Sequence, residues 1–167
     1  VIGIAKAYAT RVGEGPFPSE LFGAEGDHLR ELGGEYGATT KRPRRCGWLD
    51  LVQLKRAVQL NGMNAVALTK MDVLDDFDKI GVCVAYRIGE REYTEMPVNP
   101  VDQAAAKPVI EFWPGWRAAT SAARRFEDLP ENARNYVQEL ERRLEVPITL
   151  VSAGRDRSQL IVREPAF

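Results

Sequence analysis

Short runs of apolar and β-branched residues recur along the chain and predict β-strands. Each run is bounded by glycine, proline or charged residues, which interrupt an extended segment. These runs predict strands over residues 1–12, 65–69, 81–88, 148–151 and 160–162. Tyr93 and Thr94 follow the 81–88 run closely enough to lie in an antiparallel partner strand.

Apolar residues at helical spacing predict an amphipathic helix in the C-terminal third of the chain. The stripe consists of Leu129, Ala133, Tyr136, Val137, Leu140 and Leu144. Asp128 and Glu131 have the spacing of a capping box that would begin this helix, and Pro147 would end it.

Two other segments carry helix start and stop signals. A short helix is predicted over 27–32, closed by Gly33 and Gly34. A further helix is predicted from an N-cap at Asp50 to Leu60, with Asn61-Gly62 as its stop signal.

Proline and glycine mark the segments expected to be loops, over 13–18, 37–47 and 97–120. Because strands and helices are mixed without a regular βαβ rhythm, the fold class predicted is α/β with mixed α+β character. The chain begins without methionine in an apolar run, which we interpret as the interior of a longer protein.

Composition narrows the function classes. The net charge of −1 provides no global field that would attract nucleic acid or an anionic membrane. No apolar run reaches the length of a transmembrane helix, and no signal peptide is recognised. Cys46 and Cys83 are expected to be buried free thiols, and the single histidine, His28, is expected at the surface. One histidine argues strongly against a zinc site.

The segment from Gly37 to Arg45 concentrates hydroxyl and guanidinium groups. Arginine binds carboxylates and phosphates through paired hydrogen bonds, so the segment is suited to a planar anion. The alternative is a solvated basic run, or a nucleic-acid contact made by Lys41 to Arg45. Nucleic-acid-binding surfaces usually spread basic residues over a face or place aromatic residues among them.

Two further segments follow predicted strands. Thr69-Lys70-Met71-Asp72 resembles the N-K-x-D guanine signature, in which a carboxylate accepts hydrogen bonds from the ring N–H and exocyclic amine of guanine. Ser152 to Arg157 has small residues that let the backbone approach a flat ligand. Taken alone, each segment is more often an ordinary strand-end turn.

The opening stretch from Gly3 to Glu20, G-I-A-K-A-Y-A-T-R-V-G-E-G-P-F-P-S-E, resembles a long motif of the adenylosuccinate synthetase family. The resemblance continues through E-Y-G-A-T-T, R-R-C-G-W-L-D, T-K-M-D, P-G-W and S-A-G-R-D-R, and covers essentially the whole of residues 1–167. It implies the C-terminal domain of a GTP-dependent ligase of AMP biosynthesis. This enzyme joins IMP and L-aspartate after GTP phosphorylates the IMP 6-oxygen.

The resemblance also implies roles for individual residues. The aspartate loop would comprise Ala38, Thr39, Thr40, Lys41, Arg42, Pro43 and Arg44. IMP would be bound by Arg42 and by the backbone of Val12. GTP would be bound by Arg44, Lys70, Met71, Asp72, Ser152, Ala153 and Gly154.

This sequence departs from the family pattern at two positions within those loops. Lys41 stands where glycine is usual, and Arg155 stands where proline is common. Glycine at the first position would permit a backbone conformation that lysine resists.

The family's phosphate loop, catalytic residues and Mg²⁺ ligands lie in an N-terminal half that this sequence does not contain. The sequence therefore predicts no catalytic residue and no metal ligand here, and no ligase activity for this chain alone. The expected full-length enzyme is a cytoplasmic homodimer without nucleic-acid or membrane partners. The alternative is a stand-alone, non-catalytic module that binds nucleotides or anions.

Overall fold

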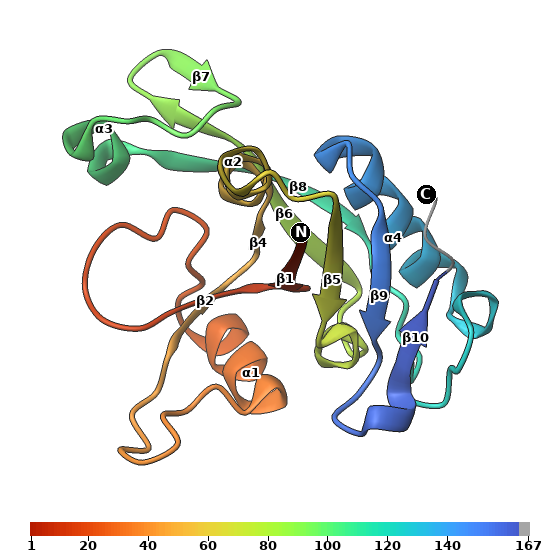
Figure 1. The fold of residues 1–167 in the computed structure, drawn as a ribbon. Helices are drawn as coiled ribbons and strands as arrows, with labels where there is room; N and C mark the ends of the chain where they lie inside the picture. Colours follow the sequence, from red (N-terminus) through yellow and green to blue (C-terminus); the bar gives the residue numbers. More distant parts are fainter. Residues whose placement is uncertain (164–167) are drawn as a thin grey trace. The chain divides into compact units, whose positions relative to one another are not determined.

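A computed structural model describes residues 1–163, and the chain divides into two compact units. Unit 1 comprises residues 1–7, 54–80 and the C-terminal part from Phe112 onward, and unit 2 comprises 8–53 and 81–111. Figure 1 shows the helices and strands of both units.

Unit 1 is built on a mostly parallel sheet with strand order β1-β5-β9-β10 (Figure 1). Its strands are β1 (Ile2–Lys6), β5 (Ala65–Thr69), β9 (Ile148–Ser152) and β10 (Leu160–Val162). β5 pairs in parallel with both β1 and β9, whereas β10 is antiparallel to β9. The central β5 is apolar and buried from Ala65 to Leu68, as expected for a strand with neighbours on both sides.

Helix α4 (Glu131–Leu144) packs in unit 1 through the predicted apolar stripe. Every member of that stripe is buried, and the Tyr136 hydroxyl donates to the Ala7 carbonyl at 2.8 Å. The predicted capping box is wrong. Pro130 is the N-cap of α4, and the Asp128 carboxylate instead accepts from the backbone N–H groups of Arg124 and Arg125, which caps the 3-10 turn η2 (Phe126–Asp128).

Unit 2 contains two small sheets. β2 (Ala9–Arg11) pairs with β3 (Arg45–Gly47), and β6 (Lys79–Ile88) pairs with β4 (Leu49–Asp50), β7 (Arg91–Tyr93) and β8 (Lys107–Pro114). The helices are α1 (Ala24–Gly33) and α3 (Pro100–Ala105). Gly34, in the left-handed conformation, ends α1. As predicted, Cys46 and Cys83 are buried and are not joined in a disulfide, and His28 on α1 is exposed.

Helix α2 (Leu51–Asn61) begins where the sequence predicts, and Asp50 Oδ1 accepts the Gln53 backbone N–H at 3.0 Å. The remaining 3-10 turns are η1 (Met71–Leu74) and η3 (Arg157–Gln159).

None of the helices in residues 1–163 combines the length and the apolar character that a membrane span requires.

Several predicted boundaries need correction. The 1–12 run is two strands, because the chain leaves β1 at Ala7 and begins β2 in another sheet at Ala9. Within the predicted 37–47 loop, residues 45–47 form β3, since they pair with β2. Helix α1 begins at Ala24, earlier than predicted.

The predicted 97–120 loop is wrong for most of its length, because it contains α3 and β8. Asn99 caps α3, and its side chain accepts the Val101 backbone N–H at 2.9 Å. Pro100 lies at the first helical position, and Pro108 and Pro114 lie early in β8 and at its end, where proline is tolerated.

Candidate functional site

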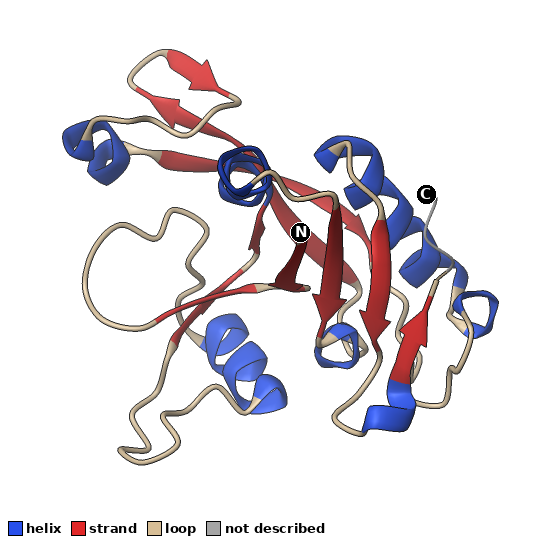
Figure 2. Cartoon of the chain, in the orientation of Figure 1, coloured by secondary structure: helices blue, strands red, loops and turns tan. Residues whose placement is uncertain are grey.

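The arginine-rich segment is a closed hairpin in unit 2, drawn as loop between α1 and β3 in Figure 2. An antiparallel bridge joins Tyr36 and Pro43, and the Gly37 N–H donates to the Arg42 carbonyl at 2.9 Å. At the tip, Ala38, Thr39 and Thr40 form a turn, and all three are exposed. The Lys41 N–H closes this turn on the Gly37 carbonyl at 3.0 Å.

Lys41 adopts the left-handed conformation, with φ of 55°. This backbone region is readily accessible to glycine but costs a residue with a Cβ atom about 1 kcal/mol. The hairpin therefore imposes at Lys41 the conformation that glycine would accept without strain.

The arginines of the hairpin differ in how far they are already engaged. Arg45 makes a paired ion pair with Glu20, with Nε–Oε1 at 2.8 Å and Nη2–Oε2 at 2.5 Å, and its Nη1 donates to the Gly13 and Gly15 carbonyls. Arg44 uses Nη1 on Glu35 Oε2 at 2.9 Å. Within residues 1–163, no hydrogen bond or ion pair engages the exposed Arg42 guanidinium.

These differences assign Arg45 to holding the 13–20 loop, which leaves Arg42 and the outer edge of Arg44 for a ligand. They also weaken the hypothesis of a nucleic-acid contact through Lys41 to Arg45, because Glu20 pairs with Arg45 through both Nε and Nη2 and so removes one cation from that run. The exposed positive charges that remain, on Lys41 and Arg42, lie close together at the hairpin tip.

Val12 lies at the same end of the β2–β3 ladder as Arg44. The ladder pairs Arg11 with Arg45, so Val12 and Arg44 both leave it at that end. Val12 is 79% exposed. The structure thus brings Val12, which was predicted to bind IMP, to the same end of the ladder as the hairpin, which was predicted to bind aspartate.

The two segments assigned to guanine follow neighbouring strands of unit 1. β5 and β9 are parallel and pair Leu68 with Val151, so Thr69-Lys70 and Ser152-Ala153 leave the sheet at the same edge (Figure 1). In open α/β sheets, ligands bind at the carboxyl ends of such strands. Segments about 80 residues apart in sequence therefore meet where a ligand is expected.

The turn after β5 presents a half-buried carboxylate. Lys70 has a left-handed backbone, with φ of 62°, and begins η1, in which Met71 is fully buried and Asp72 is half-buried. Burial raises the pKa of the Asp72 carboxyl above its ordinary value, although its backbone hydrogen bond and the charges of Arg155 and Lys70 act in the opposite direction. No side chain of the described residues donates a hydrogen bond to this carboxylate, so its oxygens are available to a ligand.

The turn after β9 is built around Gln159. The Ala153 N–H donates to the Gln159 carbonyl at 3.0 Å, and Gln159 Oε1 accepts the Asp156 N–H at 2.9 Å. A Cβ at Gly154 would lie 2.2 Å from Gln159 Oε1, so any other residue here would have to displace this amide from its hydrogen bond with Asp156. Ser152 Oγ donates to the Gly154 carbonyl at 2.8 Å.

Two supporting carboxylates were missed by the sequence reasoning. Asp75, three residues after Asp72, accepts from Trp116 Nε1 at 2.7 Å and from the Thr120 N–H at 2.8 Å. Glu35, fully buried, accepts from Tyr8 and Arg44. Trp116 and Glu35 both lie within quoted motifs, but neither motif identifies the partner.

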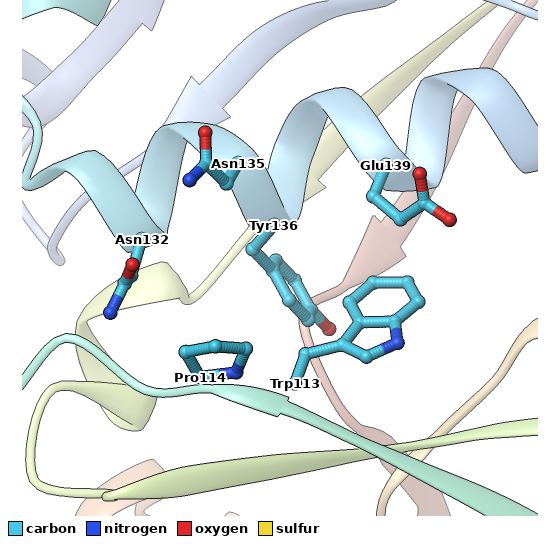
Figure 3. Close-up of a pocket in the computed structure, with 6 residues that line it drawn as sticks. All are labelled: Trp113, Pro114, Asn132, Asn135, Tyr136 and Glu139. Atoms are coloured by element: carbon cyan, nitrogen blue, oxygen red, sulfur yellow. The ribbon is translucent and has the colours of Figure 1, made fainter.

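A separate pocket of unit 1 lies between β8 and α4 (Figure 3) and has a volume of about 300 Å³. It is lined by Trp113, Pro114, Asn132, Asn135, Tyr136 and Glu139. The two aromatic rings meet edge to face at 5.5 Å, and the Glu139 carboxylate is occupied by Arg142 and Arg143. The pocket includes none of the residues that the sequence assigned to a ligand.

Comparison with known proteins identifies the family. The adenylosuccinate synthetase family model matches residues 1–161. The chain is 51% identical over 167 residues to the adenylosuccinate synthetase of Geotalea daltonii and 51% identical over 160 residues to that of Aquifex aeolicus. These matches cover 100% and 96% of this chain, but only 39% and 37% of those relatives.

A solved structure gives the same result for the fold. Fully ligated adenylosuccinate synthetase from Plasmodium falciparum matches with a TM-score of 0.92 and 40% sequence identity. The match covers 98% of this chain and 39% of that one, so the chain spans about two fifths of the length of its relatives. On the family match and this likeness of fold, the chain belongs to the adenylosuccinate synthetase family.

Proposed function

We propose that this chain is the C-terminal part of a GTP-dependent ligase that joins IMP and L-aspartate to give adenylosuccinate, GDP and phosphate. In this proposal the 38–44 hairpin binds aspartate, and the turns after β5 and β9 bind guanine. The observation that carries it is the parallel pairing of β5 and β9, which places Asp72 and Gly154 on turns at one edge of a sheet.

Guanine recognition follows from the chemistry of the two turns. The Asp72 carboxylate would accept hydrogen bonds from the ring N–H and the exocyclic amine, which guanine presents together. The aliphatic stem of Lys70 would lie along the purine face, with its ammonium outward. The backbone from Ser152 to Gly154 would approach the base closely because its residues are small.

Charge complementarity supports the role of the hairpin. Aspartate is a dicarboxylate, and Arg42 and Arg44 each offer paired N–H donors for an anion. The hydroxyls of Thr39 and Thr40 would bind a second carboxylate oxygen. In addition, Arg42 and the Val12 backbone would reach the IMP ribose, and Arg44 would neutralise charge near the GTP phosphates, the main protein contribution to phosphoryl transfer.

The family also implies Mg²⁺. Among residues 1–163, no group of three or more His, Cys, Asp or Glu side chains is arranged to hold a metal ion. We propose no Mg²⁺ ligand among the described residues, and we assign the ion, together with the catalytic residues, to a part of the protein outside this chain.

The guanine assignment is tested by Asp72→Asn in the full-length protein. An amide at this position would accept only one guanine donor and would donate to the 2-oxygen of xanthine. We expect kcat/KM for GTP to fall at least 100-fold and that for XTP to rise. Asp76→Asn, an exposed neighbour, is the matched control and should change neither value. Unchanged GTP use by Asp72→Asn would exclude the proposed guanine site.

The 167-residue chain tested alone separates the ligase from the stand-alone module. We expect no conversion of isotope-labelled aspartate by this polypeptide with IMP, GTP and Mg²⁺, but full turnover by the full-length protein. Turnover by the chain alone would refute the assignment of the reacting groups to another part of the protein.

The proposal extends to assembly and location. We propose a cytoplasmic homodimer that has no nucleic-acid or membrane partner. Size-exclusion chromatography with light scattering tests the dimer, and binding to duplex DNA or RNA at low salt tests the nucleic-acid alternative. A salt-sensitive complex with either duplex would favour that alternative for Lys41 to Arg45.

A further inference from the structure

We infer that Glu35 is a positioning residue, which holds the Arg44 guanidinium in its ligand-binding orientation before any ligand arrives. This inference rests on the proposed role of Arg44 in binding an anionic substrate. Glu35 is fully buried in unit 2, and its carboxylate is shared between Arg44 Nη1 at 2.9 Å and the Tyr8 hydroxyl at 2.5 Å.

Glu35 is fixed from both sides. Its Oε1 accepts from Tyr8, which is 1% exposed, and its backbone N–H donates to the Arg30 carbonyl at 2.9 Å. A buried carboxylate is costly unless it is paired and hydrogen bonded. Since both oxygens have partners, the carboxylate has little freedom to follow a moving arginine.

Arg44 is attached to Glu35 at two points. Its backbone N–H donates to the Glu35 carbonyl at 2.9 Å, and its side chain makes the ion pair. Arg30 Nε in turn donates to the Arg44 carbonyl at 2.9 Å. The backbone and the guanidinium of Arg44 are therefore both held at the base of the hairpin, outside its exposed tip.

This arrangement leaves half of the guanidinium for a ligand. The Arg44 side chain is 35% exposed, and within residues 1–163 its Nε and Nη2 have no acceptor. Arg42, two residues earlier, is exposed and lacks a side-chain partner. A held arginine loses less side-chain entropy on binding an anion, so Arg44 is preorganised and Arg42 is ordered only by the ligand.

The test is a double-mutant cycle in the full-length protein. Arg44→Gln identifies which KM depends on this residue, for aspartate or for GTP. Glu35→Gln keeps the side-chain shape and can still accept from Arg44 through its amide oxygen, with the Tyr8 hydroxyl now accepting from the amide N–H, but it removes the ion pair. We expect it to raise the same KM about tenfold, with a smaller fall in kcat and an unchanged KM for IMP. In the Arg44→Gln background, Glu35→Gln should have no further effect on KM.

Tyr8→Phe is the matched structural control. It removes one hydrogen bond from the buried carboxylate but leaves the ion pair, so it should lower Tm while raising that KM less than threefold. Equal effects of Tyr8→Phe and Glu35→Gln on KM, or additive effects of Glu35→Gln and Arg44→Gln, would overturn the positioning role.

A measurement without substitution covers the case in which Glu35→Gln fails to fold. In the ligand-free protein, ¹⁵N NMR should show slower rotation and proton exchange of the Arg44 guanidinium than of Arg42. Equal rates for the two arginines would overturn the inference. If Arg44→Gln leaves every KM unchanged, the proposed function of Arg44 fails; if only Glu35→Gln does so, the positioning role alone fails.

Discussion

Lys41 and Lys70 share the left-handed backbone conformation, with φ of 55° and 62°, and each lies within a loop proposed to bind a substrate. A residue with a Cβ atom pays about 1 kcal/mol for this conformation. Such strain persists only where the surrounding structure imposes it, and it gathers at functional sites. Here the Gly37–Lys41 turn imposes it on Lys41, and the start of η1 imposes it on Lys70.

Replacing Lys41 by glycine should relieve the strain in the hairpin. We expect Lys41→Gly to raise the free energy of unfolding by about 0.5 kcal/mol, because the relieved strain exceeds the extra entropy of glycine in the unfolded chain. Urea denaturation measures this change. Lys41→Ala is the control: it removes the charge but keeps the strain, so it should give no comparable rise in the free energy of unfolding. Equal stabilisation by alanine would assign the effect to charge.

Asp72 is expected to reduce the stability of the folded protein at neutral pH. Because burial raises its pKa above the ordinary value, the folded state binds this proton more tightly than the unfolded state. Its unfavourable contribution is therefore absent at low pH and appears as pH rises through its folded pKa. We expect Asp72→Asn to raise the free energy of unfolding at pH 7 but not at pH 3, as measured by urea titration. A variant less stable than the parent at pH 7 would contradict this.

Glu139, in contrast to Asp72, should stabilise unit 1 at neutral pH and lose this contribution in acid. Arg142 and Arg143 hold the pKa of Glu139 at about 2, below its ordinary 4.5, so its contribution is complete above about pH 5 and is lost as pH falls from about 4.5 to about 2. We expect Glu139→Gln to cost about 1 kcal/mol at pH 7, given partial solvent screening, and progressively less as pH falls toward 2. Glu131→Gln, exposed on the same helix, is the control and should change stability much less.

Gly115 should tolerate no side chain. A Cβ at this position would lie 1.8 Å from the Phe77 carbonyl oxygen, and the Gly115 N–H donates to the Asp78 carbonyl at 2.8 Å. We expect Gly115→Ala to lower the free energy of unfolding by about 3 kcal/mol or more. Gly89→Ala, at φ of 58° with no atom near the added Cβ, should cost about 1 kcal/mol from backbone strain alone. Thermal unfolding of both variants compares the two effects, and equal losses would argue against the close contact.

Segments with one consistent signal were predicted well from the sequence. The apolar run of β5 matches its predicted bounds, and the stripe on α4 is buried throughout. In both cases the residues that set the local structure also make the core. The N-cap at Asp50 was equally local, because its partner is Gln53.

Predictions failed where pairing over long distances decides the structure. Residues 107–114 were expected to be loop because of their prolines, yet β8 pairs with β6. The capping box at Asp128 failed for a local reason: its carboxylate accepts from the Arg124 and Arg125 N–H groups instead of capping α4. Sequence spacing cannot decide between such competing partners.

For the candidate site too, the sequence indicated the local segments but not their distant partners. The sequence located the hairpin and both strand-end turns, because each is a continuous segment of unusual composition. It did not reveal that Arg45 is engaged by Glu20 or that Arg44 is engaged by Glu35, since these partners are 25 and 9 residues away. Adjacent arginines therefore look equivalent in sequence and differ in the structure.

The contact of Trp116 with Asp75 gives unit 1 an internal optical probe. The buried indole donates to a carboxylate that ends η1, the turn that carries Asp72. Indole emission responds to the charge and polarity beside its N–H group. A rearrangement of that turn on nucleotide binding would therefore change tryptophan fluorescence without any added label, and binding could be titrated on the natural protein.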